Sequence, residues 1–77
     1  MKVAVKTFGN LRRFLPDQRQ GEWVELASGA TVLDLLGFLG IPENEAWRVS
    51  CNGALVSLNH SLSDGDQVSI FAPVGGG

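Results

Sequence analysis

Three features of the sequence carry groups that could take part in chemistry. They are the single cysteine, Cys51, the single histidine, His60, and a run of three glycines that ends at Gly77. A thiolate is a nucleophile, an imidazole can carry a proton or bind a metal, and a terminal carboxylate is an anion that reacts poorly until another molecule activates it. Each feature also has a purely structural explanation, so the surrounding elements decide between the two.

Cys51 and His60 favour the structural explanation. A lone cysteine excludes an internal disulfide, a cysteine-ligated iron–sulfur cluster and the usual cysteine-rich zinc sites, and it fits a reducing compartment. Cys51 could bear a persulfide, but a free cysteine in a strand pattern is more typical of a small buried side chain. His60 lies in a polar loop without a cysteine or carboxylate constellation around it, so we expect it at the surface and predict no metal site.

The terminal stretch "IFAPVGGG" places three glycines directly after an apolar strand pattern. Glycine loses more backbone freedom on ordering than any other residue and has no side chain to pack, so these glycines contribute nothing to a core. A glycine-rich end is often only a frayed terminus. After such a strand, however, a segment without Cβ atoms is suited to enter a narrow enzyme channel, and the pattern favours a functional tail.

The composition predicts one small domain and excludes several classes of partner. Of the 77 residues, 44% are hydrophobic and 18% are charged, which is a globular balance. The net charge of −2 and the single basic pair Arg12-Arg13 provide no field for binding nucleic acid. The sequence has neither a membrane-spanning apolar run nor a signal-peptide pattern, so we expect no membrane association and a cytoplasmic protein.

Alternating apolar residues predict five strands that would position these groups. The predicted strands cover residues 2–8, 22–26, 47–51, 54–58 and 67–72. Asn52-Gly53 is the strongest local signal, because a type I′ hairpin turn requires positive φ at both of its central residues. Trp23 and Trp47 could mark an interface, but a small core often recruits tryptophan for its area, and we expect both to be buried.

One helix is predicted between the second and third strands. Thr31 is a suitable N-cap, and Asp34 three residues later completes a carboxylate version of the capping box. Gly40 stands where a C-terminal cap is needed, and Pro42 prevents continuation of the helix. Its apolar stripe consists of Val32, Leu35, Leu36 and Leu39.

The element order β, β, α, β, β, β predicts an α+β fold with a mixed sheet packed on one main helix. In this β-grasp (ubiquitin-like) arrangement the first and last strands pair in parallel at the centre. Residues 1–74 would form the domain and residues 75–77 a flexible glycine tail. Phe71 has the opposite parity to the inward residues of its strand and would be a partly exposed anchor, while Pro73 would end the strand and direct Val74 away from the sheet.

Together, three stretches resemble the MoaD/ThiS family of ubiquitin-like sulfur carriers. They are "GATVLDLLGFLG", "VSCNGALVSLNHSLSDGDQVSIFAPV" and the terminal "GG". The resemblance implies that the carboxylate of Gly77 is adenylated by an E1-like adenylyltransferase with ATP and magnesium. A sulfurtransferase or cysteine desulfurase would then supply the sulfur of a thiocarboxylate. It also implies that Gly75, Gly76, Val74, Pro73 and Phe71 contact partners, and that the chain itself binds no cofactor.

The resemblance leaves the receiving pathway open. The segment between the first two strands and the stretch "IFAPV" look like the branch that serves molybdopterin (or tungstopterin), in which the carrier is the non-catalytic small subunit of a synthase with a large subunit. The ending "VGGG" looks like the thiamine branch. The sequence is also compatible with a sulfur carrier of another pathway, a ubiquitin-like protein modifier whose activated terminus is joined to a lysine, and a β-grasp adaptor that only binds partners.

Overall fold

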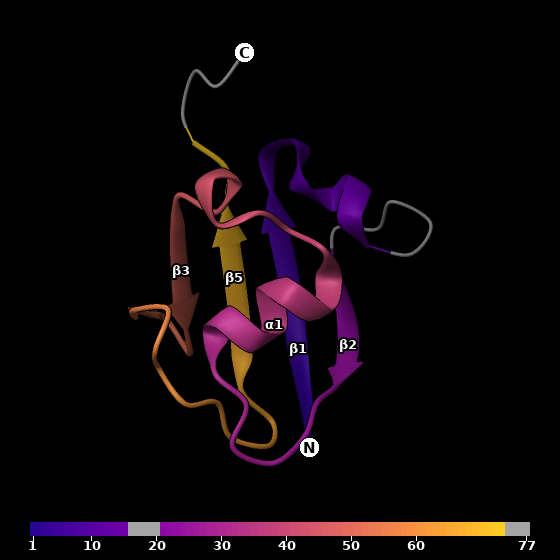
Figure 1. Cartoon of the computed structure of the whole chain (residues 1–77), viewed down its shortest axis with the longest axis vertical. Helices are drawn as coiled ribbons and strands as arrows, with labels where there is room; N and C mark the ends of the chain where they lie inside the picture. Colours follow the sequence, from indigo (N-terminus) through magenta and orange to yellow (C-terminus); the bar gives the residue numbers. More distant parts are fainter. Residues whose placement is uncertain (16–20, 74–77) are drawn as a thin grey trace.

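A mixed β-sheet with one α-helix across one face forms the body of the molecule. The computed structural model describes residues 1–15 and 21–73. Within these residues the strands form one five-stranded sheet in the order β2-β1-β5-β3-β4 (Figure 1). The elements are β1 (Lys2–Phe8), the 3₁₀ helix η1 (Gly9–Phe14), β2 (Gly21–Glu25), α1 (Val32–Leu39), the 3₁₀ helix η3 (Glu43–Glu45), β3 (Arg48–Cys51), β4 (Ala54–Leu55) and β5 (Gln67–Phe71).

The centre of the sheet is the parallel pair of β1 and β5, as the sequence predicts. Val5 lies opposite Val68 and Thr7 opposite Ile70, while β2 and β3 pair antiparallel on the two outer sides. Parallel neighbours cannot be joined by a tight turn, so the chain between them must cross the sheet. That crossover contains α1 (Figure 1).

The start of α1 is fixed by the predicted capping box. The Thr31 hydroxyl accepts a hydrogen bond from the Asp34 backbone N–H at 3.2 Å, and the Asp34 carboxylate accepts one from the Thr31 backbone N–H at 2.9 Å. The helix ends at Gly40, whose φ of 77° lies in the left-handed region that favours glycine. Both predicted ends are therefore confirmed, because each depends on local backbone chemistry.

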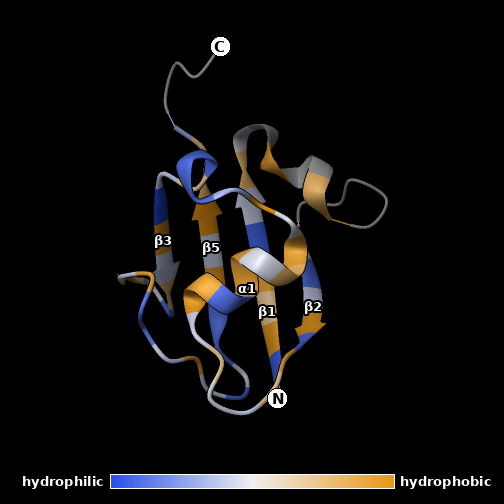
Figure 2. Ribbon diagram, viewed as in Figure 1, coloured by the Kyte–Doolittle hydropathy of each residue, from blue (hydrophilic) through white to orange (hydrophobic). Residues whose placement is uncertain are grey.

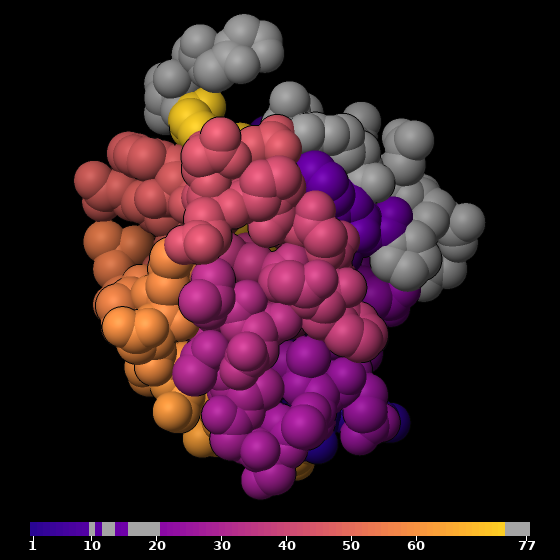
Figure 3. Space-filling model, viewed as in Figure 1, coloured from indigo at the N-terminus to yellow at the C-terminus, as the bar shows by residue number. Residues whose placement is uncertain are grey.

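The hydrophobic core lies between α1 and the sheet. In β1 every second residue from Val3 to Thr7 is buried, and in β5 the buried positions are Val68 and Ile70. The apolar stripe of α1 faces these strands, so its side of the sheet is covered (Figure 2, Figure 3). The described part of the chain contains no helix that is long and apolar enough to cross a membrane.

The β3–β4 hairpin contains the predicted turn but a shorter fourth strand. Asn52 and Gly53 have φ values of 54° and 88°, as a type I′ turn requires. The fourth strand ends at Leu55 and does not reach residue 58. The Val56 N–H still donates to the Val49 carbonyl of β3 at 3.0 Å, but beyond it the chain turns to the helix, where the Leu58 carbonyl accepts from the Leu33 N–H at 3.0 Å, at the start of α1. This segment supports the helix instead of extending the sheet.

The expectation that both tryptophans are buried is wrong. Trp23 is 60% exposed and Trp47 is 51% exposed. Trp23 precedes the inward-facing Val24 in β2, so strand alternation directs it to the face that α1 does not cover. Trp47 precedes β3, and its ring lies 4.4 Å from the guanidinium carbon of Arg48. Both rings are therefore part of the surface.

The helix offers a matched test of the core. Leu35 is fully buried and Leu33, two residues earlier, is 40% exposed. We expect Leu35→Ala to lower the free energy of unfolding by about 2–5 kcal/mol, because it leaves a cavity against the sheet. Leu33→Ala should lower it by less than about 1 kcal/mol. Urea denaturation followed by circular dichroism measures both, and equal effects would contradict this packing of α1.

Candidate functional site

The end of β5 is held by hydrogen bonds on both sides. The Phe71 carbonyl accepts from the Trp47 N–H at 2.8 Å, and the Ala72 N–H donates to the Phe8 carbonyl at 3.4 Å. Pro73 follows, is exposed, and has no N–H with which to extend the pairing. The central strand is therefore anchored up to residue 72, directly before the predicted tail.

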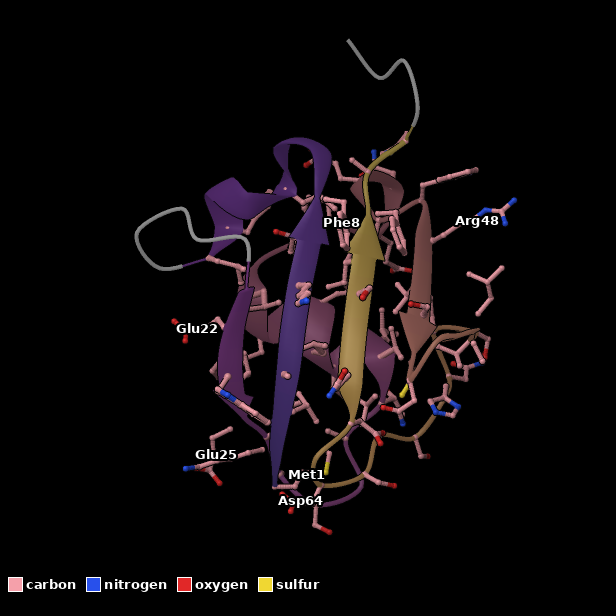
Figure 4. The ribbon with its side chains drawn as sticks, turned by 180° about the vertical axis from the view of Figure 1, so that it is seen from behind. Met1, Phe8, Glu22, Glu25, Arg48 and Asp64 are labelled. Carbon is pink, nitrogen blue, oxygen red and sulfur yellow. The ribbon has the colours of Figure 1, made fainter. Side chains whose placement is uncertain are left out.

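Phe71 forms an aromatic stack with Phe8 at this end of the sheet. Their ring centroids are 4.8 Å apart and the ring planes differ by 11°. Both rings are half-buried and have the opposite parity to the core residues of their strands, so they lie on the face that α1 leaves open (Figure 4). The expectation of a partly exposed Phe71 is confirmed, and Phe8 adds a second aromatic ring to it.

Gly9 allows a close approach beside this aromatic pair. Its φ is 76°, and a Cβ added to it would stand only 2.9 Å from the Cβ of Ala72. A side chain there would therefore displace the backbone that holds the end of β5. Sequence reasoning missed both Phe8 and Gly9. The parity of Phe8 in its strand was a usable signal, but the contact with Ala72 depends on the register of two distant strands.

A shallow groove of about 310 Å³ lies along β3 and β4. It is lined mainly by apolar groups, including Trp47, Val49, Leu55 and Leu58. The hydrogen bond from Trp47 to Phe71 connects the groove to the end of β5. At the outer end of β3, Arg48 contributes a positive charge to this edge (Figure 4).

Cys51 is buried, as the sequence predicts. Burial, and then a hydrogen bond and the negative charge of Asp66, raise the pKa of its thiol from 9.0 to about 11. At neutral pH it is therefore a thiol and a weak nucleophile. Cys51 pairs with Val68 while Arg48 pairs with Phe71, so the cysteine lies roughly 10 Å along the sheet from the aromatic pair.

The fold brings His60 and Asp66 to Cys51, a cluster that sequence reasoning missed. One potential ligand atom from each of the three residues lies within 4.8 Å of the other two. Hydrogen bonds from the Ser63 backbone and the Asn52 side chain lower the pKa of Asp66, so its carboxylate is charged at neutral pH. Cys51 ends β3, while His60 and Asp66 belong to two later segments of the chain, so the sequence shows no short motif that contains all three residues.

Comparison with known proteins decides the family. The model of the ThiS family matches residues 5–77, almost the whole chain. The chain belongs to the ThiS family. The predicted resemblance to ubiquitin-like sulfur carriers is thus confirmed, and so is the β-grasp fold. A search of curated protein sequences found no match.

Solved structures resemble this ThiS-family chain over nearly their full length. A candidate molybdopterin converting factor subunit 1 from Pyrococcus furiosus is 31% identical, with a TM-score of 0.73 over 95% of this chain and 98% of that one. A chain in the complex of subunits 1 and 2 of molybdopterin-converting factor from Helicobacter pylori 26695 is 28% identical, with a TM-score of 0.63 over the whole of both chains. SAMP1 from Haloferax volcanii is 24% identical, with a TM-score of 0.75 over the whole of both chains, and this likeness supports the fold alone.

Several predicted site residues of this ThiS-family chain fall outside the described residues. They are Val74, Gly75, Gly76 and Gly77, which include the proposed flexible tail. Of the predicted partner contacts, the structure places Phe71 and Pro73, which lie two residues apart at the anchored end of the central strand.

The environment of Cys51 predicts a slow thiol. Raising the pKa from 9.0 to about 11 reduces the thiolate fraction near neutrality, and burial blocks access to the sulfur. We therefore expect an aromatic disulfide reagent to label folded protein at least about 100-fold more slowly than protein unfolded in urea. Stopped-flow absorbance measures both rates, and rapid labelling of the folded chain would show that the thiol is open and activated.

Proposed function

We propose that this chain is a sulfur carrier whose reactive group is the carboxyl group of Gly77. A carboxylate is an anion at neutral pH and a poor electrophile, so it needs activation. An E1-like enzyme would join it to the AMP part of ATP, with magnesium, and release pyrophosphate. A persulfide on a sulfurtransferase or cysteine desulfurase would then attack the acyl adenylate and displace AMP, and a second thiol would reduce the resulting acyl disulfide to leave a thiocarboxylate. The catalytic groups and ATP would belong to the partners.

The observation that carries this proposal is the anchored end of β5 within a ThiS-family chain. Four residues follow Pro73, and fully extended they span at most about 14 Å. An enzyme that encloses Gly77 must therefore also contact the folded body. The backbone bonds that hold Phe71 and Ala72 give such an enzyme a fixed reference for the last residues.

The face around Phe8 and Phe71 is the surface that we assign to partner binding. Aromatic side chains are frequent anchors at protein interfaces, and this pair is half-buried before any partner binds, so little side-chain freedom is lost on binding. Pro73 and Trp47 lie beside it and are exposed. We propose that the E1-like enzyme and a large synthase subunit use this face in turn.

Sulfur delivery to molybdopterin, or tungstopterin, is the pathway that we favour. It is supported by the likeness to molybdopterin converting factor subunit 1, including one solved together with subunit 2. In that case the chain would act as the small subunit of a synthase. A carrier of the thiamine pathway or a protein modifier would use the same activated carboxyl group and would differ in the final acceptor.

Removal of the last two glycines tests the reactive group. The change Δ76–77 should abolish ATP–pyrophosphate exchange with a cognate E1-like enzyme while the unfolding transition stays unchanged, because the tail contributes no core. In the intact chain, activation with a sulfur donor should raise the mass by about 16 Da, the difference between sulfur and oxygen.

Three outcomes would contradict the sulfur-carrier proposal. Exchange that survives the deletion would leave a non-reactive adaptor as the explanation. A native product that continues uncleaved past Gly77 would overturn the assignment of its carboxyl group. Attachment of a whole second protein, seen in the same mass spectrum, would identify a modifier instead.

Phe71→Ala tests the docking face, with Phe38→Ala as its matched control. Phe38 is 63% exposed on α1, on the opposite side of the sheet. We expect Phe71→Ala to weaken binding to the E1-like enzyme by at least about 10-fold, while Phe38→Ala leaves it within about twofold. Isothermal titration calorimetry measures both, and equal losses would place the docking face elsewhere.

A further inference from the structure

The far end of the sheet contains a three-residue cluster, Cys51, His60 and Asp66, which the proposed sulfur chemistry does not use. Cys51 is the last residue of β3, His60 belongs to the turn before the bridge to Thr31, and Asp66 immediately precedes β5. Their potential ligand atoms all lie within 4.8 Å of one another. The cluster is therefore a meeting point of three chain segments.

Backbone hydrogen bonds hold each member of the cluster in place. The His60 N–H donates to the Ser57 carbonyl at 3.1 Å, and its carbonyl accepts from Val32 at 3.0 Å. The Asp66 N–H donates to the Ser63 carbonyl at 3.1 Å, while Cys51 is paired with Val68 in the sheet. A ligand bound here would meet a largely preformed site and would not have to order these turns itself.

The Asp66 carboxylate keeps free acceptor capacity in this arrangement. One oxygen accepts from the Ser63 N–H at 2.8 Å and the other from the Asn52 amide at 3.0 Å. A carboxylate offers about four lone-pair positions, and the Cys51 thiol uses a third one, which an ion that displaces the thiol proton would take over. They also fix the orientation of the carboxylate, as hydrogen bonds to metal ligands commonly do.

The combination of donors selects a class of ion. Sulfur, nitrogen and oxygen together suit zinc and similar divalent ions, whereas calcium and magnesium prefer oxygen alone. We propose that Cys51, His60 and Asp66 bind one zinc-class divalent ion, with water at the fourth position. This inference replaces the sequence-based expectation of no metal, and it goes beyond the proposed sulfur carrier.

The distances fit this ion after a small closure. Tetrahedral zinc with bonds of about 2.0–2.3 Å separates its ligand atoms by roughly 3.3–3.8 Å. The potential ligand atoms lie at most 4.8 Å apart, so a rotation of the His60 side chain that moves its ring nitrogen by about one ångström completes the site. The Cys51 backbone stays in the sheet.

The charges also balance. The ion displaces the Cys51 proton to solvent and forms a sulfur–metal bond, so a thiolate, the Asp66 carboxylate and a neutral imidazole surround a charge of +2. The charge of the ion offsets the burial and the repulsion from the Asp66 carboxylate that keep Cys51 a neutral thiol in the free chain. Its effect would be structural: it links the β3–β4 hairpin, the 57–60 turn and the turn before β5.

Cobalt binding tests the site in the full chain. Because the sequence has one cysteine, any sulfur-to-cobalt charge-transfer band in the near ultraviolet must come from Cys51. We expect that band to saturate at one cobalt ion per reduced chain, with tetrahedral bands in the visible, and zinc to displace it. Zinc should also raise the melting temperature.

Two variants and one control variant test which residues bind the ion. His60→Gln and Asp66→Asn should each weaken cobalt binding at least about 10-fold, measured by the same band. Asp64→Asn is the matched control, because Asp64 lies two residues from Asp66 and its carboxylate accepts instead from the Lys2 N–H at 2.8 Å. It should bind cobalt like the unchanged chain.

Circular dichroism of each variant without metal establishes that it is folded before binding is compared. Absence of the charge-transfer band, or a band that His60→Gln leaves unchanged, would overturn the proposal and leave the cluster as a hydrogen-bonded support for the hairpin. Neither outcome affects the sulfur-carrier function, because the cluster and Phe71 lie at opposite ends of β5.

Discussion

Parallel pairing of β1 with β5 is the constraint on which the rest of the molecule depends. Two parallel strands cannot be joined by a hairpin, so the chain between them has to cross the sheet, and here it does so through α1 and the β3–β4 hairpin. The crossover places the apolar stripe of α1 over the central strands and closes the core. It also places β5 between β1 and β3, so the backbone at Phe71 and Ala72 forms hydrogen bonds on both sides of the strand.

The two ends of β5 have different proposed roles: one supports the tail, and the other contributes to the proposed metal site. At the end of β5 the aromatic pair Phe8 and Phe71 and the close approach of Gly9 to Ala72 stiffen the point at which the tail begins. A carrier of the proposed kind needs a rigid attachment point for its tail, because another protein activates its carboxyl group. At the start of β5, the end of β3 and the segments that contain His60 and Asp66 come together. A metal ion there would reinforce the same sheet from its other end without touching the tail.

Several aromatic side chains lie on the part of the surface that α1 does not cover. The face opposite α1 presents Trp23 and the aromatic pair, and the adjoining edge presents Trp47 beside Arg48. Both tryptophans are therefore surface residues and add little to the thin core of this small domain. The groove along β3 and β4, which Trp47 lines, adds further apolar groups at this edge.

The sequence by itself determined the features whose causes are local. The Thr31–Asp34 box, the αL cap at Gly40 and the Asn52-Gly53 turn depend on backbone sterics and nearby side chains, and alternation determined which residues of β1 and β5 face the core. Tertiary structure decided what depends on the register of distant segments: the stack of Phe8 on Phe71, the early end of the fourth strand, the exposure of the tryptophans and the gathering of Cys51, His60 and Asp66. Such contacts are set by which strands become neighbours, and no short stretch of sequence contains that information.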